Sequence, residues 1–459
     1  MKPSIPQGTR DFSPADVRRR QYILNTIKAV FEVYGFQPLE TPSMENLNTL
    51  MGKYGEEGDR LIFKILNNGL HEKKDQAKLH EEWEKILSKP YSSTTVTERA
   101  LRYDLTIPFA RYVVMHQNDL AFPFKRYQMQ PVWRADRPQR GRYREFWQCD
   151  ADVVGSNSLL NEAELLCIYQ DAFDRLKVPG IQVKINSRKV LAGLAECCGA
   201  ADQLTDITVA IDKLDKIGWD GVAKELGERG LEADKINYIQ NYLSISGSTE
   251  ERLAAMEALL KDSAIAQQGI AELRTTLQYV AQLQQTSWTS EILVDFTLAR
   301  GLNYYTGVIV EVGTTAVKMG SIGGGGRYDD LTGLFGLKGL SGVGVSFGID
   351  RIYDVMTELN LFPEDVDVTT RILFVNIEPQ AEGAILGYLS RLRNAGISAE
   401  LYSDAAKFDK QMKYANKRQI PYVGIVGSSE LEQGQINVKD MQSGTQSLQK
   451  IDELVNLLK

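Results

Sequence analysis

Apolar positions near the start of the chain recur every three or four residues, which is the spacing of one helix face. They run over residues 17–34, and Ser13 stands where an N-cap residue is expected. Pro14 suits the first helical position, and Asp16 completes a capping box. The pattern predicts a helix that begins at Pro14 and ends before Gly35.

Residues 124–155 show the other period, in which neighbouring side chains alternate in kind. Phe146, Gln148, Asp150 and Asp152 share one parity, whereas the residues between them are apolar. Because successive strand side chains point to opposite faces, one face is apolar and the other carries a ring, an amide and carboxylates. A tight turn over residues 137–141 separates two such strands. This hairpin holds seven basic residues: Lys125, Arg126, Arg134, Arg137, Arg140, Arg142 and Arg144. A polar face beside such an arginine-rich hairpin is suited to binding an amino acid and a polyphosphate. The alternative is that the polar face of an antiparallel hairpin is only exposed to solvent.

The middle of the chain changes in composition. Residues 190–285 are rich in Ala, Leu, Lys, Glu and Gln with helical periodicity, and we interpret them as a helical insertion. Strand patterning returns at 292–312 and at 342–356, and the second segment turns into a helix near Gly348. Residues 66–90 are charged and are typical of a surface insertion or a mobile hairpin.

A short polar linker over residues 361–370 separates the last part of the chain. Beyond it strands alternate with helices, which predicts a small α/β domain with a mixed or mostly parallel sheet. The sequence therefore predicts three parts: residues 1–190 with 288–362, residues 191–287, and residues 370–459.

Composition narrows the classes of function. The net charge is −7, so any binding of nucleic acid has to come from local basic patches. The four cysteines form no CxxC pair, which favours a reducing, cytoplasmic setting. The three histidines lack zinc-site spacing, so we expect neither zinc nor a histidine triad. Without an apolar leader or a run of eighteen apolar residues, we expect no membrane segment.

Three arginines stand where a phosphate would need one. Arg134 ends the first hairpin strand, Arg300 precedes a glycine in TLARGLNYY, and Arg351 opens a helix in FGIDRI. Arginine offers a planar fork of donors that stays charged, so it suits phosphate oxygens. The alternative for each is a surface ion pair. No GxxxxGK[ST] occurs, so ATP would bind without a P-loop.

Two further segments are candidates for contact with ligands. A run of glycines loses much conformational entropy when the chain folds. Such a run is therefore usually found where the backbone has to approach a ligand closely. We expect this of the glycine-rich loop Gly323, Gly324, Gly325 and Gly326. The basic helical segment 407–418 is either an RNA-facing surface or a solvated face.

Together these segments resemble the class II aminoacyl-tRNA synthetases and, among them, the histidyl-tRNA synthetase family. GTRDFSP with its helix and LETP resembles the first class motif, the hairpin ending in Arg134 the second, and GVGVSFGIDRI the third. ARGLNYY at 299–305 and GGGRYD at 324–329 are similar to the two segments peculiar to histidyl enzymes. YDLTIPFARY and QCDAD are closer to the eukaryotic-type branch.

The resemblance implies an α+β catalytic domain on a mostly antiparallel six-stranded sheet flanked by helices, a helical insertion and a C-terminal α/β anticodon-binding domain. It also implies a homodimer whose interface involves Pro42. The implied activity joins L-histidine to ATP, giving histidyl-adenylate and pyrophosphate, and then transfers histidine to the 3′ end of tRNA(His). ATP would carry Mg²⁺. A regulatory paralogue that binds histidine without activating it is the alternative, although the C-terminal domain and the arginine set argue against it.

The resemblance also implies site residues. Those implied to hold the α-amino group are Asp104, Thr106 and Gln148; Asp152 and Tyr305 would read the imidazole, with Tyr304 and Arg300 also in the histidine pocket. Arg134 and Arg300 would stabilise the α-phosphate as catalytic residues. ATP would also contact Arg142, Phe146, which stacks on adenine, and Arg351, which sits at the adenine and γ-phosphate end. Asp104 and Asp152 stand where many members carry glutamate.

Overall fold

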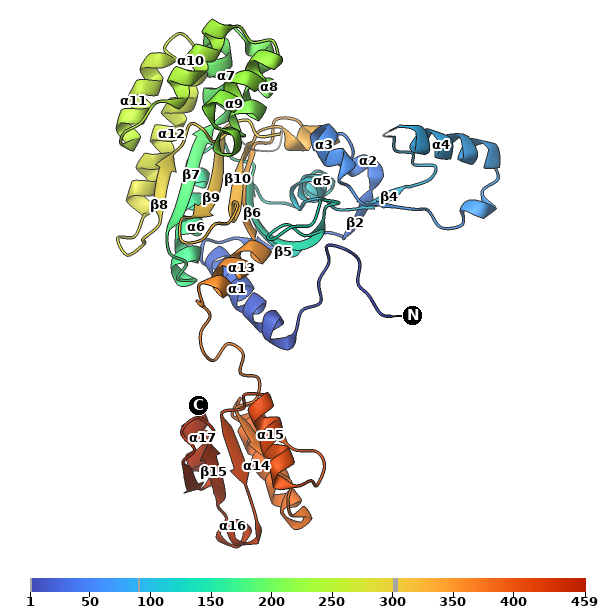
Figure 1. Cartoon of the computed structure of the whole chain (residues 1–459), viewed down its shortest axis with the longest axis vertical. Coiled ribbons are helices and arrows are strands. Elements are labelled where there is room, and N and C mark those ends of the chain that lie inside the picture. The colour runs from blue at the N-terminus through green and yellow to red at the C-terminus, as the bar shows by residue number, and fades with distance from the viewer. Residues whose placement is uncertain (1, 90, 300–303) are drawn as a thin grey trace. The chain divides into compact units, whose positions relative to one another are not determined.

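The computed structural model describes residues 2–89, 91–299 and 304–459. They divide into two compact units, one ending at Phe362 and the other running from Pro363 to Lys459 (Figure 1). None of the helices in these ranges is both long and apolar enough to cross a membrane.

The first unit is built on one large sheet. Its strands, in spatial order, are β1 (Gln37–Pro38), β5 (Phe124–Trp133), β6 (Glu145–Val154), β11 (Gly342–Gly348), β10 (Gly323–Tyr328), β9 (Val308–Thr314), β7 (Ile181–Ser187) and β8 (Glu291–Val294). The six from β5 to β7 are all antiparallel, whereas the short edge strands β1 and β8 pair parallel. The mostly antiparallel sheet is thus confirmed, but it has eight strands in place of the six expected.

One face of this sheet is covered by helices and forms the main core. The helices are α1 (Pro14–Val33), α6 (Leu160–Arg175) and α13 (Ile349–Glu358). The predicted start of α1 is confirmed, because Ser13 caps the helix and the capping box with Asp16 is formed. Every apolar side chain that α1 buries follows the helical spacing: Ile23, Ile27, Val30 and Phe31. Burial of this stripe holds α1 against the sheet.

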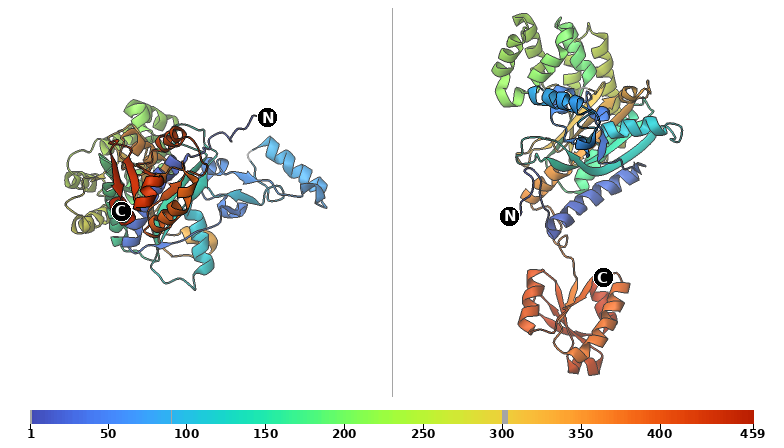
Figure 2. Two further views of the ribbon diagram at one scale, coloured as in Figure 1. Left: turned by 90° about the horizontal axis from the view of Figure 1, so that it is seen from below. Right: turned by 90° about the vertical axis from the view of Figure 1, so that its right-hand side faces the viewer.

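Smaller elements lie on the opposite face. They are α5 (Thr106–His116), α2 (Leu47–Leu50), α3 (Gly55–Arg60), η3 (Leu331–Phe335) and a three-stranded sheet of β2 (Met44–Asn46), β4 (Arg99–Leu101) and β3 (Lys64–Ile65). Their apolar side chains form a second core cluster. The stretch predicted as a surface insertion contains η1 (Leu70–Glu72) and α4 (Gln76–Ser88), a helix that stands away from the large sheet in the left-hand view of Figure 2.

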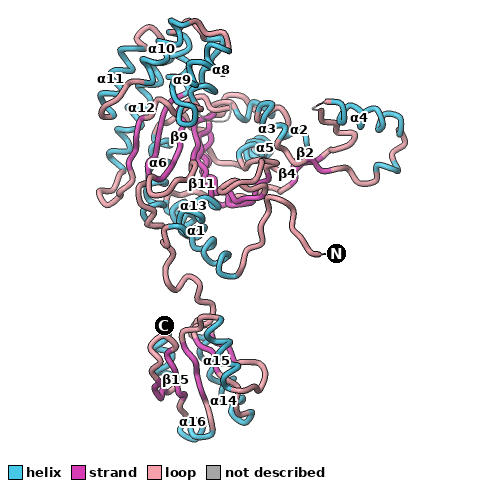
Figure 3. Tube along the Cα trace, viewed as in Figure 1, coloured by secondary structure: helices cyan, strands magenta, loops and turns pink. Residues whose placement is uncertain are grey.

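The region predicted to be helical contains helices throughout. They are α7 (Arg188–Cys197), η2 (Ala201–Gln203), α8 (Leu204–Ile211), α9 (Leu214–Glu228), α10 (Ala233–Leu243), α11 (Thr249–Leu259) and α12 (Ala264–Leu283). They gather at the end of the large sheet that carries β7 and β8 (Figure 3). They belong to the first compact unit, and the domain boundaries expected around them stay predictions.

The second unit is a five-stranded α/β structure. Its strands, in spatial order, are β13 (Ala399–Leu401), β12 (Ile372–Phe374), β14 (Tyr422–Ile425), β15 (Ile436–Asp440) and β16 (Gln446–Gln449). Its helices are η4 (Pro379–Ala381), α14 (Glu382–Asn394), α15 (Phe408–Lys417), α16 (Ser428–Gln433) and α17 (Ile451–Leu458). The first three strands pair parallel and the others antiparallel, as the predicted mixed sheet requires.

Candidate active site

The floor of the site is the polar face of the large sheet. On β6, Gln148, Asp150 and Asp152 lie opposite Gly348, Ser346 and Gly344 of β11. The side chains between them on β6 are buried in the main core. The alternation predicted from the sequence is therefore present, with the carboxylates on one face and apolar groups on the other.

Asp152 is held from two sides. Its Oδ2 lies 2.8 Å from Nη2 of Arg126, which is fully buried on β5, and the Tyr328 hydroxyl on β10 donates to Oδ1. Burial raises the pKa of Asp152, and the Arg126 charge opposes that rise. Neither Arg126 nor Tyr328 was among the predicted site residues. The signal for Arg126 was its parity, because it stands opposite Asp152 across the hairpin.

Gln148 and Asp150 share one hydroxyl. Gln148 Nε2 donates to Ser346 Oγ at 3.0 Å, and the Ser346 side chain hydrogen-bonds Asp150. Gln148 Oε1 and Asp150 Oδ1 are buried, and neither has a hydrogen-bond partner among the described residues. Burial raises the pKa of Asp150 to about 7. Asp150 is a further residue that the expected set did not include.

Asp104 and Thr106 flank the start of α5. The strand β4 ends at Leu101, and Asp104 accepts the Ile107 N–H at 3.2 Å, as residues before a helix do. The Tyr54 hydroxyl donates to the same Oδ1 at 2.8 Å, and Oδ2 is buried with no hydrogen-bond partner in the part of the chain that the structure describes. Burial raises the pKa of Asp104; Arg134 and Asp152 are close enough to influence it.

Two tyrosines close the same end of the site. The rings of Tyr304 and Tyr305 lie 4.9 Å apart, and Tyr304 is 6.1 Å from the ring of Tyr328. Burial raises the pKa of both hydroxyls. Arg300, the other residue expected from this segment, lies outside the described residues.

The end of the hairpin brings Arg134 and Phe146 together. Arg134 Nε donates to the Tyr103 carbonyl at 3.0 Å, and its guanidinium lies 4.2 Å from the Tyr103 ring and 5.2 Å from the Phe146 ring. Because these partners carry no net charge, the guanidinium is oriented without being neutralised. An anion can therefore still bind it.

Arg142 and Arg351 lie at the turn of the hairpin. Arg142 is half exposed and 3.7 Å from Asp136. Arg351, in the first turn of α13, donates from Nε to the Gly141 carbonyl at 2.7 Å and from Nη1 to the Ser321 carbonyl. Arg351 therefore links the turn to the segment that precedes β10.

The four glycines form part of β10, so the prediction of a loop was wrong. A Cβ on Gly325 would lie 2.1 Å from the Gly344 carbonyl oxygen, and one on Gly326 would lie 2.8 Å from the Tyr305 ring. Their small size lets strand and tyrosine approach the backbone closely. The strand lies in the middle of the sheet, which excludes a flexible loop.

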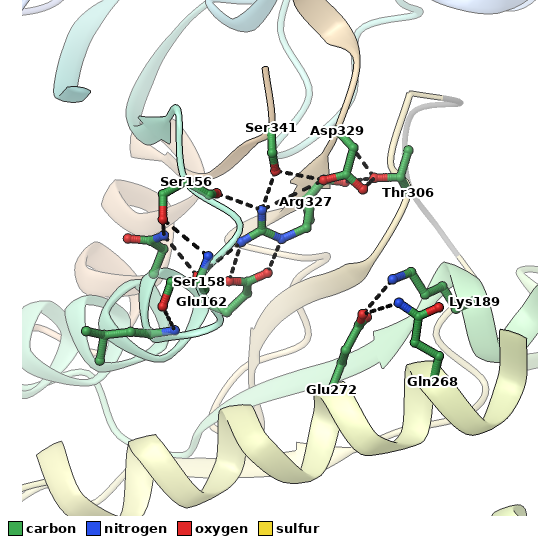
Figure 4. A network of polar contacts seen from close by, with 12 residues as sticks. Ser156, Ser158, Glu162, Lys189, Gln268, Glu272, Thr306, Arg327, Asp329 and Ser341 are labelled. Atoms are coloured by element: carbon green, nitrogen blue, oxygen red, sulfur yellow. Dashed lines mark hydrogen bonds and ion pairs between the residues drawn. The ribbon is translucent and has the colours of Figure 1, made fainter. Parts of the chain in front are cut away.

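Arg327 anchors the end of the tyrosine segment. Its guanidinium forms a two-pronged ion pair with Glu162 and reaches the Ser156 carbonyl at 3.1 Å (Figure 4). Its own carbonyl accepts the Thr306 N–H at 2.8 Å, and the Thr306 hydroxyl donates to Asp329 at 2.6 Å. Thus hydrogen bonds of Thr306, which follows the two tyrosines, join the ARGLNYY segment to the GGGRYD segment.

The site has an acidic end and a basic end. Asp104, Asp150 and Asp152, each about 2 % exposed, suit a cationic amino group and ring N–H donors. Arg134 and Arg351 suit phosphate oxygens. Within the described ranges no group of three or more His, Cys, Asp or Glu is arranged to hold a metal ion.

The chain is similar to known proteins over its whole length. The family profile "Histidyl-tRNA synthetase" matches residues 84–352, and "Anticodon binding domain" matches residues 371–459. A protein of Bacteroides fragilis named histidine–tRNA ligase is 53 % identical over 459 residues, covering 100 % of this chain and 99 % of that protein. One of the same name from Christiangramia forsetii is 53 % identical over 461 residues, with the same coverage.

Solved structures give the same relationship. The histidyl-tRNA synthetase of a Nostoc species superimposes with a TM-score of 0.83 and 30 % identity, covering 100 % of this chain and 99 % of that one. A Bacillus halodurans protein described as an ATP phosphoribosyltransferase regulatory subunit/histidyl-tRNA synthetase shares the fold, with a TM-score of 0.70 at 18 % identity. With the profile match and the full-length identity, the chain belongs to the histidyl-tRNA synthetase family.

Proposed function

We propose that this chain activates L-histidine with ATP and transfers it to tRNA(His). The observation that carries the proposal is the pairing of buried carboxylates with an arginine that has no anionic partner among the described residues, Arg134, at the neighbouring end of the site. The full-length relatives named histidine–tRNA ligase support this activity over that of a regulatory subunit that only binds histidine.

The acidic end would hold histidine. Asp104, Thr106 and Gln148 would bind its α-ammonium group, since Asp104 Oδ2 and Gln148 Oε1 are buried acceptors to which no described residue donates a hydrogen bond. Asp152 and Tyr305, with Tyr304 beside them, would face the imidazole. The acceptors are already in place, so binding would satisfy groups whose desolvation is otherwise uncompensated.

The basic end would hold ATP. The guanidinium of Arg134 would contact the α-phosphate, the Phe146 ring would stack on adenine, and Arg142 and Arg351 would bind the outer part of the nucleotide. Arg300 belongs to the same proposal. The histidine carboxylate is already ionised and attacks the α-phosphorus directly, so this step needs no general base. Catalysis then rests on positioning and on charge stabilisation of the phosphoryl oxygens.

Other parts of the proposal concern partners. ATP would bring Mg²⁺ with it, and no zinc is required. Residues 371–459, which match an anticodon-binding profile, would contact the tRNA, with the basic face of α15 as one surface.

We further propose a cytoplasmic homodimer with Pro42 at its interface. Residues 191–287 would be an insertion in the catalytic domain formed by 1–190 and 288–362, and 370–459 a separate domain.

Pyrophosphate exchange into ATP tests the activation step. Purified protein would be assayed with Mg²⁺ and each of the twenty amino acids, without tRNA. Exchange with histidine alone is the expected result. Exchange with another amino acid would contradict the pocket assignment, and measurable histidine binding without exchange would favour the regulatory function.

A further inference from the structure

We propose that Arg102 is a positioning residue for the activation step, because it sets the place of the Arg134 guanidinium that would stabilise the α-phosphate. The inference rests on the proposed function and adds to it a residue that was not among the predicted site residues. Arg102 directly follows β4 and is fully buried. Its main chain and its side chain both bond to β5, the strand that leads into Arg134.

Four acceptors hold the Arg102 guanidinium. Its Nε donates to the Pro131 carbonyl at 2.9 Å and its Nη1 donates to Gln130 Oε1 at 2.9 Å, and both acceptors belong to β5. Nη1 also donates to the carbonyls of Thr41, at 2.7 Å, and Pro42, at 3.3 Å. The side chain of Arg102 therefore ties the segment before β2 to the end of β5.

The connection between Arg102 and Arg134 runs in both directions. The N–H of Trp133, which precedes Arg134, donates to the Arg102 carbonyl at 3.1 Å. Arg134 Nε in turn donates to the carbonyl of Tyr103, which follows Arg102, at 3.0 Å, and its guanidinium lies 4.2 Å from the Tyr103 ring. A displacement of residues 102–103 would therefore move both the acceptor and the ring that orient Arg134.

The environment of Arg102 points to positioning and not to stability alone. No carboxylate in the described ranges lies at ion-pair distance from its guanidinium, and its Nη2 is buried with no hydrogen-bond partner there. Burial lowers the pKa of Arg102 to about 10. A buried cation without a carboxylate is costly, and an apolar side chain of similar volume would avoid that cost. An apolar side chain would lack the planar fork that reaches Pro131 and Thr41 at once.

Asp104, which would hold the histidine, lies close to Arg102 in the sequence but has its own support. Its Oδ1 accepts from the Tyr54 hydroxyl at 2.8 Å and from the Ile107 N–H at 3.2 Å. Neither of these contacts involves Arg102. A substitution of Arg102 should therefore disturb the α-phosphate end of the site more than the binding of histidine.

Arg102→Lys tests the proposal, because lysine keeps the charge and loses the fork. In histidine-dependent pyrophosphate exchange with the full-length protein, kcat should fall about 10- to 100-fold, since misplacing a catalytic group by about 1 Å has an effect of that order. The fall should not exceed that of Arg134→Ala, and KM for histidine should stay within about twofold. An unchanged kcat, or a KM for histidine that rises as much as kcat falls, would overturn the proposal.

Combining Arg102→Lys with Arg134→Ala shows whether the two residues act as a unit. Once the Arg134 guanidinium is absent, Arg102→Lys should lower the remaining exchange rate by less than about threefold. The matched control is Glu162→Gln, which disturbs another buried arginine, Arg327, in the same compact unit. The factors of Glu162→Gln and Arg134→Ala should multiply. If the factors of Arg102→Lys and Arg134→Ala multiply as well, Arg102 acts only through the fold and the proposal is overturned.

Gln130→Met provides a second variant, in which Arg102 itself remains. It removes one acceptor of the guanidinium and leaves the carbonyl contacts, so kcat should fall about two- to fivefold. This fall should largely disappear when Arg134 is alanine. No fall, or an undiminished fall in that background, would contradict the role of Arg102 even if Arg102→Lys does not fold. Absence of exchange in the unaltered protein would instead refute the proposed function itself.

Discussion

Glu162→Gln is the sharpest test of how the site is supported. Glu162 on α6 is 2 % exposed and pairs with both prongs of Arg327, which is 5 % exposed on β10. The substitution keeps the shape but leaves Arg327 charged and buried, which costs about 3–5 kcal/mol in comparable sites. The hydrogen bonds from Arg327 to the Ser156 carbonyl and Ser341 hydroxyl offset part of that loss.

The expected shift in melting temperature follows from the size of the unit. At about 2.1 cal/mol/K per residue, a unit of 362 residues unfolds with an entropy of about 0.76 kcal/mol/K. A loss of about 3–5 kcal/mol then lowers Tm by about 4–7 °C. Thermal unfolding followed by circular dichroism at a fixed scan rate measures this shift.

Glu164→Gln is the matched control on the same helix. Glu164 pairs with Lys125 at 2.5 Å, but both side chains are about a quarter exposed, so the loss should be about 1 kcal/mol or less. Adding Arg327→Met to Glu162→Gln removes the stranded charge and should recover part of the Tm. Equal melting temperatures for Glu162→Gln and Glu164→Gln, or no recovery in the double variant, would refute the reasoning.

Three other outcomes depend on single contacts. Arg134→Ala should lower the rate of pyrophosphate exchange about 10²- to 10³-fold. Arg142→Ala should lower that rate less, because Arg142 is half exposed; equal losses in the two variants would contradict the phosphate assignment. Gly325→Ala should lower Tm by several degrees in a melting scan, because its Cβ would meet a carbonyl oxygen at 2.1 Å. Tyr54→Phe removes a bond that lowers the pKa of Asp104, so that pKa rises further. As the pH falls, Asp104 should then lose its charge sooner, and KM for histidine should rise at a higher pH than in the unaltered protein; superimposable profiles would contradict this.

The polar face of β6 could be predicted from the sequence because strand geometry has a fixed period of two. The alternation of Gln148, Asp150 and Asp152 with apolar residues determines which side chains share a face, whatever the neighbouring strands are. The partner of each carboxylate could not be predicted, because Arg126 and Ser346 belong to two other strands. Such contacts are set by register between segments remote in sequence.

The strand formed by the four consecutive glycines could not be predicted from the sequence. Local propensity disfavours a strand at four consecutive glycines, and tertiary contacts override it. Gly323 lies against the Tyr169 ring and Gly326 against the Tyr305 ring, so each position is glycine because of a side chain elsewhere. The helix α4 could not be predicted either, because its single buried side chain is Glu82. Without a buried apolar stripe, its sequence resembles that of a charged loop.

The partners of the arginines separate support from ligand binding in a way that sequence motifs cannot. Arg126 and Arg327 are buried and paired with Asp152 and Glu162, so their charge is neutralised inside the protein. Arg134 is held by a carbonyl and two aromatic rings, and within the described ranges no carboxylate lies at ion-pair distance from it. Partners without charge fix the plane of a guanidinium but leave its electrostatic field intact. The field of Arg134 is thus available to a phosphate whose charge grows during reaction, whereas adding an anion at Arg126 would require breaking its pair with Asp152.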